Sequence, residues 1–399
     1  MSDADSSSGG LADSFTETTS TGWFSRIGQS IAGVLFGIVL ILGSGVLMFW
    51  NEGRAVQTAR SLAEGQGVVV DADATRVEPG NDGKLVHVAG DLKTTAPLND
   101  PEFGVSVPAA RLVRTVEMYQ WKEDSHTETR KNFGGSEEHV TTYTYVQTWS
   151  DNRIDSGKFK RPDGHANPQM RYRRFEAAAR DATLGAFRPS ERVLAHLAAG
   201  SEFRVEPAGL DAVRQRAGAS AQITDGRIYL GVDPAQPRVG DLRISYHVAA
   251  VGPVSMIGRQ AGTDFAEYQT KAGDRLLMLR AGTLSAGDMF KAAEEENRIL
   301  TWILRAVGVV AMLIGWMLMM RPLVVLADVI PFLGSVIGAG TGLIALLVTA
   351  VVAPIVIAIA WFWYRPLVSA GVLVVGFAVA YGIRTLAARR HARAAPAPA

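Results

Sequence analysis

The chain of 399 residues contains no cysteine. This absence excludes disulfide bonds, zinc sites built on thiolates and a cysteine nucleophile. Net charge is nearly absent too, with 40 lysines and arginines against 39 aspartates and glutamates, so we expect no nucleic-acid partner. HExxH, GxSxG and P-loop patterns are missing, and the seven histidines are scattered. We therefore expect no metal site, no cofactor and no enzymatic activity.

Long uncharged apolar stretches lie near both ends of the chain and enclose a polar middle. The first covers residues 27–50, between Arg26 and Glu52. A hydrocarbon core of about 30 Å requires about 20 helical residues, so this stretch is long enough to span a bilayer. Three more stretches follow within residues 299–381. The pattern predicts an integral membrane protein with four transmembrane helices, one N-terminal and three C-terminal.

The fold class we expect is an α+β multi-pass membrane protein whose large β-rich domain lies outside the cytoplasm. The first residues are acidic and rich in serine and threonine, a composition typical of disorder. In chain order we expect a disordered tail (1–26), transmembrane helix 1 (27–51), the extracytoplasmic domain (52–298), transmembrane helices 2 (299–321), 3 (335–363) and 4 (366–384), and a basic cytoplasmic tail (385–399).

Within the polar middle, short β-branched and aromatic runs predict strands, and an alanine-rich region predicts helix. We expect strands at 68–71, 85–90, 111–121, 140–149, 223–230, 241–249 and 275–279, a long polar loop at 122–139 and helical structure over 172–218. Ser285 and Asp288 form a capping-box pattern that opens a helix. That helix either continues into the second apolar stretch or breaks near Glu296.

The orientation follows from positive charge after the last apolar stretch. Arg384, Arg389, Arg390 and Arg393 favour a cytoplasmic C-terminus, because cytoplasmic flanks carry an excess of lysine and arginine. Four spans then put both termini in the cytoplasm. The large domain would face the periplasm of a bacterium or the lumen of a eukaryotic organelle.

Charged residues at the membrane edge are the candidate site residues. An unpaired carboxylate there is costly, so we expect Glu52 to pair with Arg365 or Arg305 and to fasten the first helix to the other three. The alternative is that the Glu52 carboxylate contacts only water and lipid headgroups. Small residues spaced four apart permit close helix contact, and two such pairs occur: Gly33 with Gly37, and Gly334 with Gly338.

Several ordered motifs resemble one family. They include Asn51-Glu52-Gly53-Arg54-Ala55, Val116-Glu117-Met118-Tyr119-Gln120-Trp121, Val239-Gly240-Asp241-Leu242-Arg243 and Tyr364-Arg365-Pro366-Leu367. Together they make the chain similar to the transmembrane protein 43 (LUMA) family over nearly its whole length. No catalytic residues are implied by this resemblance.

The resemblance implies an endomembrane protein that organises membrane protein complexes, as a scaffold within the lipid bilayer. In animals it implies the endoplasmic reticulum and nuclear inner membrane, with emerin and lamins as partners; in a bacterium it implies the inner membrane and other partners. We also expect a homo-oligomer. Alternatives are a channel or transport component, suggested by Arg305 and by glycine and proline in the third apolar stretch, and an extracytoplasmic enzyme, which no motif favours.

Overall fold

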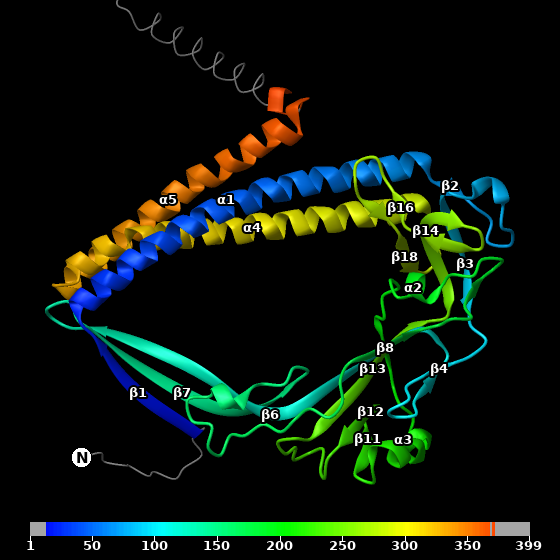
Figure 1. Ribbon diagram of the computed structural model, residues 1–399, viewed down its shortest axis with the longest axis horizontal. Coiled ribbons are helices and arrows are strands. Elements are labelled where there is room, and N and C mark those ends of the chain that lie inside the picture. The colour runs from blue at the N-terminus through cyan, green and yellow to red at the C-terminus, as the bar shows by residue number, and fades with distance from the viewer. Residues whose placement is uncertain (1–12, 368, 372–399) are drawn as a thin grey trace, which may run out of the picture. The chain divides into compact units, whose positions relative to one another are not determined.

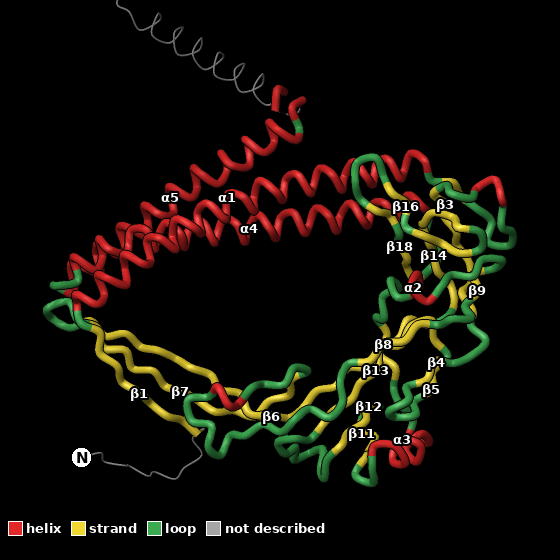
Figure 2. The backbone as a smooth tube through the Cα atoms, in the orientation of Figure 1, coloured by secondary structure: helices red, strands yellow, loops and turns green. Residues whose placement is uncertain are grey.

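The structure, a computed structural model, describes residues 13–367 and 369–371 (Figures 1 and 2). Its contacts divide the chain into two compact units. The β-rich unit holds the segments up to Ser20, Ser61–Arg130 and Glu138–Ala293. The helical unit holds Thr21–Arg60, Lys131–Glu137 and the chain from Glu294 onward. Each unit is thus assembled from segments far apart in the sequence.

Three of the described helices are long and apolar enough to cross a membrane: α1 (Trp23–Val68), α4 (Ala286–Ala327) and α5 (Pro331–Tyr364). A helix satisfies its backbone hydrogen bonds internally, which is why apolar segments take this form in lipid. The described residues thus contain three of the four predicted transmembrane helices. Most of the predicted fourth helix and the whole predicted basic tail, residues 372–399, lie outside the described part of the chain.

The helix at α4 begins as the sequence predicts. The Ser285 hydroxyl accepts a hydrogen bond from the backbone nitrogen of Asp288 at 3.1 Å and donates one to its carboxylate at 2.7 Å. The helix then continues past Glu296 without a break, so the continuous alternative is correct. It also runs through Pro322 to Ala327, beyond the end expected at residue 321, because a membrane helix can tolerate a proline whose lost hydrogen bond is compensated by its surroundings.

The larger sheet has eight strands and includes the first described residues of the chain. Its members are β1 (Asp13–Thr21), β6 (Ala109–Lys131), β7 (Glu137–Ser150), β8 (Phe175–Ala178), β10 (Ser201–Phe203), β11 (Ala221–Thr224), β12 (Arg227–Leu230) and β13 (Leu242–Ala250). The order is β1-β7-β6-β13-β12-β11, with β10 beside β13 and β8 beside β6. In the antiparallel β6–β13 pair, Val116 lies opposite Ile244.

The second sheet has six strands and holds the other half of the β-rich core. They are β2 (Val70–Asp71), β3 (Leu85–Lys93), β9 (Thr183–Leu184), β14 (Gly252–Ala261), β15 (Asp264–Ala266) and β18 (Met278–Ala281). Smaller elements are the pairs β4 (Leu98–Asn99) with β5 (Ser106–Val107) and β16 (Tyr268–Gln269) with β17 (Arg275–Leu276), and the short helices α2 (Glu191–Leu194) and α3 (Leu210–Ala217).

The core of the larger sheet encloses one buried polar network. The hydroxyl of Tyr246 donates to Asp100 at 2.7 Å, and Arg114 donates to both carboxylate oxygens of Asp100 at 2.7 Å. All three side chains are buried. Burial and the neighbouring carboxylate raise the pKa of Tyr246 well above its usual range, so the hydroxyl stays a donor. A fully satisfied network of this kind helps to specify one packing arrangement.

Several sequence-based predictions in this region are wrong. Residues 13–26, expected to be disordered, form β1 and the start of α1, because β7 supplies the hydrogen-bonding partners that an isolated polar segment lacks. The first twelve residues lie outside the described part. The expected loop at 122–139 is mostly strand, since β6 and β7 continue to a turn where Gly134 and Gly135 have positive φ angles of 87° and 79°.

In the region 172–218, α-helix is confined to α2 and α3, and the rest is strand and irregular structure. Ala177 and Ala178 pair with β6 in the sheet, and tertiary pairing overrides the helix propensity of alanine. The strands predicted at 68–71, 85–90, 111–121, 140–149 and 241–249 overlap strands of the structure. The predictions at 223–230 and 275–279 are wrong as single strands: the first is the hairpin of β11 and β12, and the second is divided between β17 and β18. The alternating face of residues 241–249 is confirmed, with Leu242, Ile244, Tyr246 and Val248 all buried.

Candidate functional site

The candidate site is a buried ion pair that joins three membrane helices. Glu52 of α1 is fully buried. Arg305 of α4 donates to it twice, from Nε to Oε1 at 2.6 Å and from Nη2 to Oε2 at 2.9 Å. The indole nitrogen of Trp361 on α5 donates to Oε2 at 2.9 Å. We call Glu52, Arg305 and Trp361 the clamp. In it, the Glu52 carboxylate of α1 binds one side chain of α4 and one of α5.

The clamp has the geometry that a charge pair in a low-dielectric setting requires. Two parallel hydrogen bonds between guanidinium and carboxylate are the strongest form of this pair. Arg305 also lies over the ring of Trp302, with its guanidinium carbon 4.7 Å from the ring centroid, which adds a cation–π contact. Breaking such a pair by removing one partner leaves an uncompensated buried charge.

The residues around Glu52 attach α1 to α4 by further polar contacts. Asn51 donates to the carbonyl of Thr301 at 3.0 Å, and Arg54 donates to Asn297 at 2.9 Å. Asn297 in turn donates to the carbonyl of Ala55 at 3.0 Å. The motif Asn51–Ala55 is therefore a helix-joining motif, with Arg54 facing Asn297 and Thr301 instead of Glu52.

Gly53 completes this motif by a close approach to α5. A Cβ atom at Gly53 would lie 2.6 Å from Cζ of Tyr364, so any larger residue would displace that ring. Arg365, the other partner considered for Glu52, lies at the end of α5, where its backbone nitrogen donates to the carbonyl of Trp361 at 2.7 Å. Its side chain makes no contact with Glu52 in the described structure, so the pairing is with Arg305.

The four candidate packing glycines behave differently. A Cβ at Gly37 would lie 2.7 Å from the carbonyl oxygen of Gly315, so α1 and α4 approach closely there. Gly334 is equally tight, against Asp328. Gly338 has only ordinary contact space at 3.6 Å from Val324, and Gly33 has nothing within 4 Å. The spacing pattern thus finds Gly37 but misses its partner Gly315, since spacing carries no information about which helix faces which.

A second buried charge cluster, which sequence reasoning missed, lies at the other end of α1. Arg26 pairs with Glu137 at 2.7 Å and with Asp328, and Lys131 pairs with Asp328 at 2.6 Å. We call Arg26, Lys131, Glu137 and Asp328 the tip cluster, because Lys131 and Glu137 flank the turn of the β6–β7 hairpin. No sequence signal connects these residues, since the hairpin and the ends of α1 and α4 are far apart in the chain.

The tip cluster and β1 bear on the orientation of the chain. A bilayer separates the two ends of a helix that spans it. Residues before α1 pair with β7, and Arg26 contacts Glu137, so the N-terminal segment shares a side with this hairpin. The predicted topology puts the N-terminal segment in the cytoplasm and the hairpin outside it. The pairing of β1 with β7 and the predicted orientation therefore cannot both hold in one molecule.

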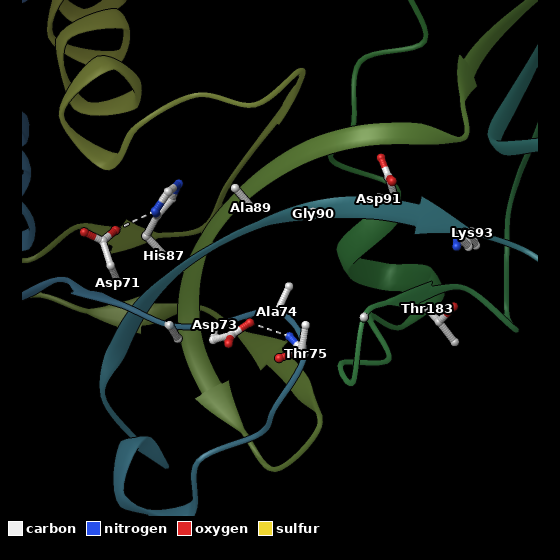
Figure 3. A pocket seen from close by; sticks show the side chains of 12 residues that line it. Asp71, Asp73, Ala74, Thr75, His87, Ala89, Gly90, Asp91, Lys93 and Thr183 are labelled. Atoms are coloured by element: carbon white, nitrogen blue, oxygen red, sulfur yellow. Dashed lines mark hydrogen bonds and ion pairs between the residues drawn. The ribbon is translucent and has the colours of Figure 1, made fainter.

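Over the described residues, no group of three or more His, Cys, Asp or Glu side chains could hold a metal ion. His87 lines a cavity of about 600 Å³ with Asp71, Asp73 and Asp91 (Figure 3). Both of its ring nitrogens are engaged, one by Asp71 at 2.7 Å and the other by the carbonyl of Leu284 at 3.0 Å. It therefore fastens β2 to β3 and to the residues that precede α4.

His165 holds β1 against the sheet, and we expect its replacement to release that strand. Its ring lies 3.9 Å from the ring of Tyr145, and its Nε2 faces the carboxylate of Asp13 at 2.9 Å. His165→Phe keeps the stacking but removes the hydrogen bond. Hydrogen exchange of residues 14–21 should become faster in this variant, while β13 should be unchanged. Unaltered exchange of β1 would contradict this role, and His196→Phe, on an exposed helix end, is the control.

Known proteins are similar to this chain over most of its length. The family model described as transmembrane protein 43 matches residues 118–366. Transmembrane protein 43 of Mus musculus is 35% identical over 370 residues, which is 89% of this chain and 90% of the mouse protein. The Homo sapiens protein is 36% identical over 363 residues, 87% and 88% of the two chains.

A more distant relative extends the same similarity. The transmembrane protein 43 homolog of Drosophila melanogaster is 28% identical over 367 residues, 86% of this chain and 91% of its own. No solved structure matches. With three apolar helices and relatives that align over most of both chains, this chain is an integral membrane protein and belongs to the transmembrane protein 43 family.

Proposed function

We propose that this protein is a non-enzymatic membrane scaffold, which organises membrane protein complexes through its β-rich unit. The observation that supports the proposal is that the buried charges among its helices pair with one another. In the clamp and the tip cluster, each carboxylate and each cation binds another element of the same chain. Ionisable groups in membrane segments otherwise mark ion or proton pathways. Here they are used to hold helices together.

A channel or transporter receives less support from the same helices. The cavity between α1, α4 and α5 is lined by Ile41, Leu42, Gly45, Val46, Phe49, Met312, Val352, Val356 and Ile359. These side chains offer no oxygen or nitrogen to replace the hydration shell of an ion. The described part of the helical unit therefore provides fixed packing surfaces, which suit an anchor for the β-rich unit.

The partners we propose are other membrane proteins and further copies of this chain. Alternating polar and aromatic side chains of β7 are only partly buried, and β1 is an edge strand of the larger sheet. Partly covered surface of this kind can bind another protein. For relatives in animals, the proposal includes partners at the endoplasmic reticulum and inner nuclear membrane; for a bacterial chain, it includes partners in the inner membrane.

Chemical cross-linking in native membranes, followed by purification of the full chain, tests the scaffold. We expect cross-links to the same membrane proteins, or to a second copy, to recur on residues of the β-rich unit. Liposomes containing the purified protein serve as the comparison, and we expect no ion flux in them. Recovery of the protein alone, together with flux that depends on it, would favour the channel instead.

A further inference from the structure

Arg321 is an unusual residue in the helical unit. It lies within the apolar part of α4, and its side chain is exposed. Arg26 and Arg305 are also at membrane helices, and both are in ion pairs, Arg26 buried and Arg305 mostly buried. Arg321, by contrast, makes no ion pair and no side-chain hydrogen bond with the residues that the structure describes. A cation at such a position requires an anionic partner, because an unpaired charge in an apolar setting is costly.

A groove in the helical unit begins beside this guanidinium. It has a volume of about 380 Å³ and lies between α4 and α5. Its walls are formed by Ile314, Met317, Leu318, Arg321 and Val324 on α4 and by Gly338, Thr341 and Gly342 on α5. The groove is open at Gly342, where a Cβ atom would meet nothing within 4 Å.

The chemistry of the walls is divided between one charge and an apolar surface. The hydroxyl of Thr341 donates to the carbonyl of Gly338 at 3.0 Å, so it is already satisfied within its own helix. Apart from Arg321 and this satisfied hydroxyl, the lining consists of aliphatic side chains, methionine and glycine. An occupant that fits both parts has an anionic group at one end and a hydrocarbon chain at the other.

We propose that this groove binds an anionic phospholipid, with its phosphate on Arg321 and an acyl chain over Gly338 and Gly342. Guanidinium groups recognise phosphate oxygens through paired hydrogen bonds, and arginine sheds water more readily than lysine. The acyl chain covers aliphatic wall that would otherwise face water or a loosely packed tail. A free phosphate ion satisfies Arg321 but leaves the remaining wall uncovered, so the lipid is the better match.

Native mass spectrometry of the full chain in detergent tests the site, with phosphatidylglycerol and phosphatidylcholine as the two probes. We expect the protein to retain phosphatidylglycerol in preference to phosphatidylcholine. In Arg321→Gln, retention of phosphatidylglycerol should fall about fivefold, since one basic residue near an anionic lipid surface is worth about 1 kcal/mol. Arg298→Gln, an exposed arginine on the same helix, should leave retention unchanged.

A second pair of variants tests the groove independently of the charge. Gly342→Leu places a side chain in open space within the groove, and leucine is a better helix former than glycine, so folding is not threatened. We expect it to reduce retention of the lipid. Gly340→Leu, which also has open space but does not line the groove, is the matched control.

Four results would overturn the proposal. One is equal retention of the two lipids by the unaltered chain, and another is full retention by Arg321→Gln. Displacement of phosphatidylglycerol by inorganic phosphate would show that the site takes the free ion. A disulfide between Gly342→Cys and Leu373→Cys in a doubly substituted chain would show that the chain's own C-terminal segment fills the groove.

Discussion

Glu52→Gln is expected to lower the free energy of unfolding in detergent by about 3–5 kcal/mol, the cost of leaving a buried ion pair without one partner. The variant keeps the shape of the side chain but leaves Arg305, which is mostly buried, without a countercharge. Thermal unfolding followed by intrinsic fluorescence measures the effect. Glu294→Gln removes an exposed carboxylate on α4 and should cost little, as surface charges contribute about 0–1 kcal/mol.

The double variant Glu52→Gln with Arg305→Met separates charge from packing. A buried ion pair replaced as a whole by uncharged groups of similar size is often tolerated, so we expect most of the lost stability to return. Exchange of the two charges, Glu52→Arg with Arg305→Glu, should recover less, because the indole nitrogen of Trp361 would then face a guanidinium. The clamp has no energetic role if Glu52→Gln behaves like Glu294→Gln.

The second large effect concerns the side of the membrane on which the N-terminal segment lies. We expect Ser20→Cys and Gln147→Cys, tested one at a time, to react with a membrane-impermeant maleimide from the same side. The reason is that β1 and β7 are neighbours in one sheet, and strands cannot pair across a bilayer. The chain has no cysteine of its own, so each introduced thiol is read without background.

Labelling from opposite sides would contradict this expectation. It would show that β1 leaves β7 and that the tip cluster opens when α1 crosses the membrane, as the four-span orientation requires. Ala395→Cys provides the reference for the C-terminal side. Asp328→Asn is a useful companion variant, since it weakens the attachment of Arg26 and Lys131 without changing either strand.

Local chemistry is what the sequence predicts well. The apolar stretches at 27–50 and within 299–381 predict membrane helices because an uncharged run of that length has few other favourable environments. The capping box at Ser285 and the alternating strand at 241–249 are also local patterns, and both are present. Glu52 and Arg305 follow from a similar argument, since a carboxylate at the membrane edge requires a cation nearby. The partner could not be chosen between Arg305 and Arg365, because that choice depends on how the helices rotate.

Long-range pairing accounts for the errors. Residues 13–21 are polar and look disordered alone, but β7 offers them backbone partners, Phe15 stacks on Tyr143, and the hydrogen bond from Lys160 to Glu17 raises the pKa of that lysine. The hairpin beyond residue 122 lacks an apolar face, and its strands are held by cross-strand contacts such as Thr127 with Thr141 at 2.9 Å. Alanine-rich residues near 178 become strand where β6 lies beside them.

Sequence alone was enough to predict a membrane protein of one family, with apolar helices around a β-rich middle and Glu52 as a candidate for a charge pair. Three features became visible only in the folded chain: Trp361 and Arg305 share the Glu52 carboxylate, Gly37 meets Gly315, and Arg26 and Asp328 meet the β6–β7 turn. The difference lies in the distance along the chain over which each interaction acts. Hydropathy, capping and strand alternation act within a few residues, whereas buried charges are paired by groups hundreds of residues away, which only the packed chain brings together.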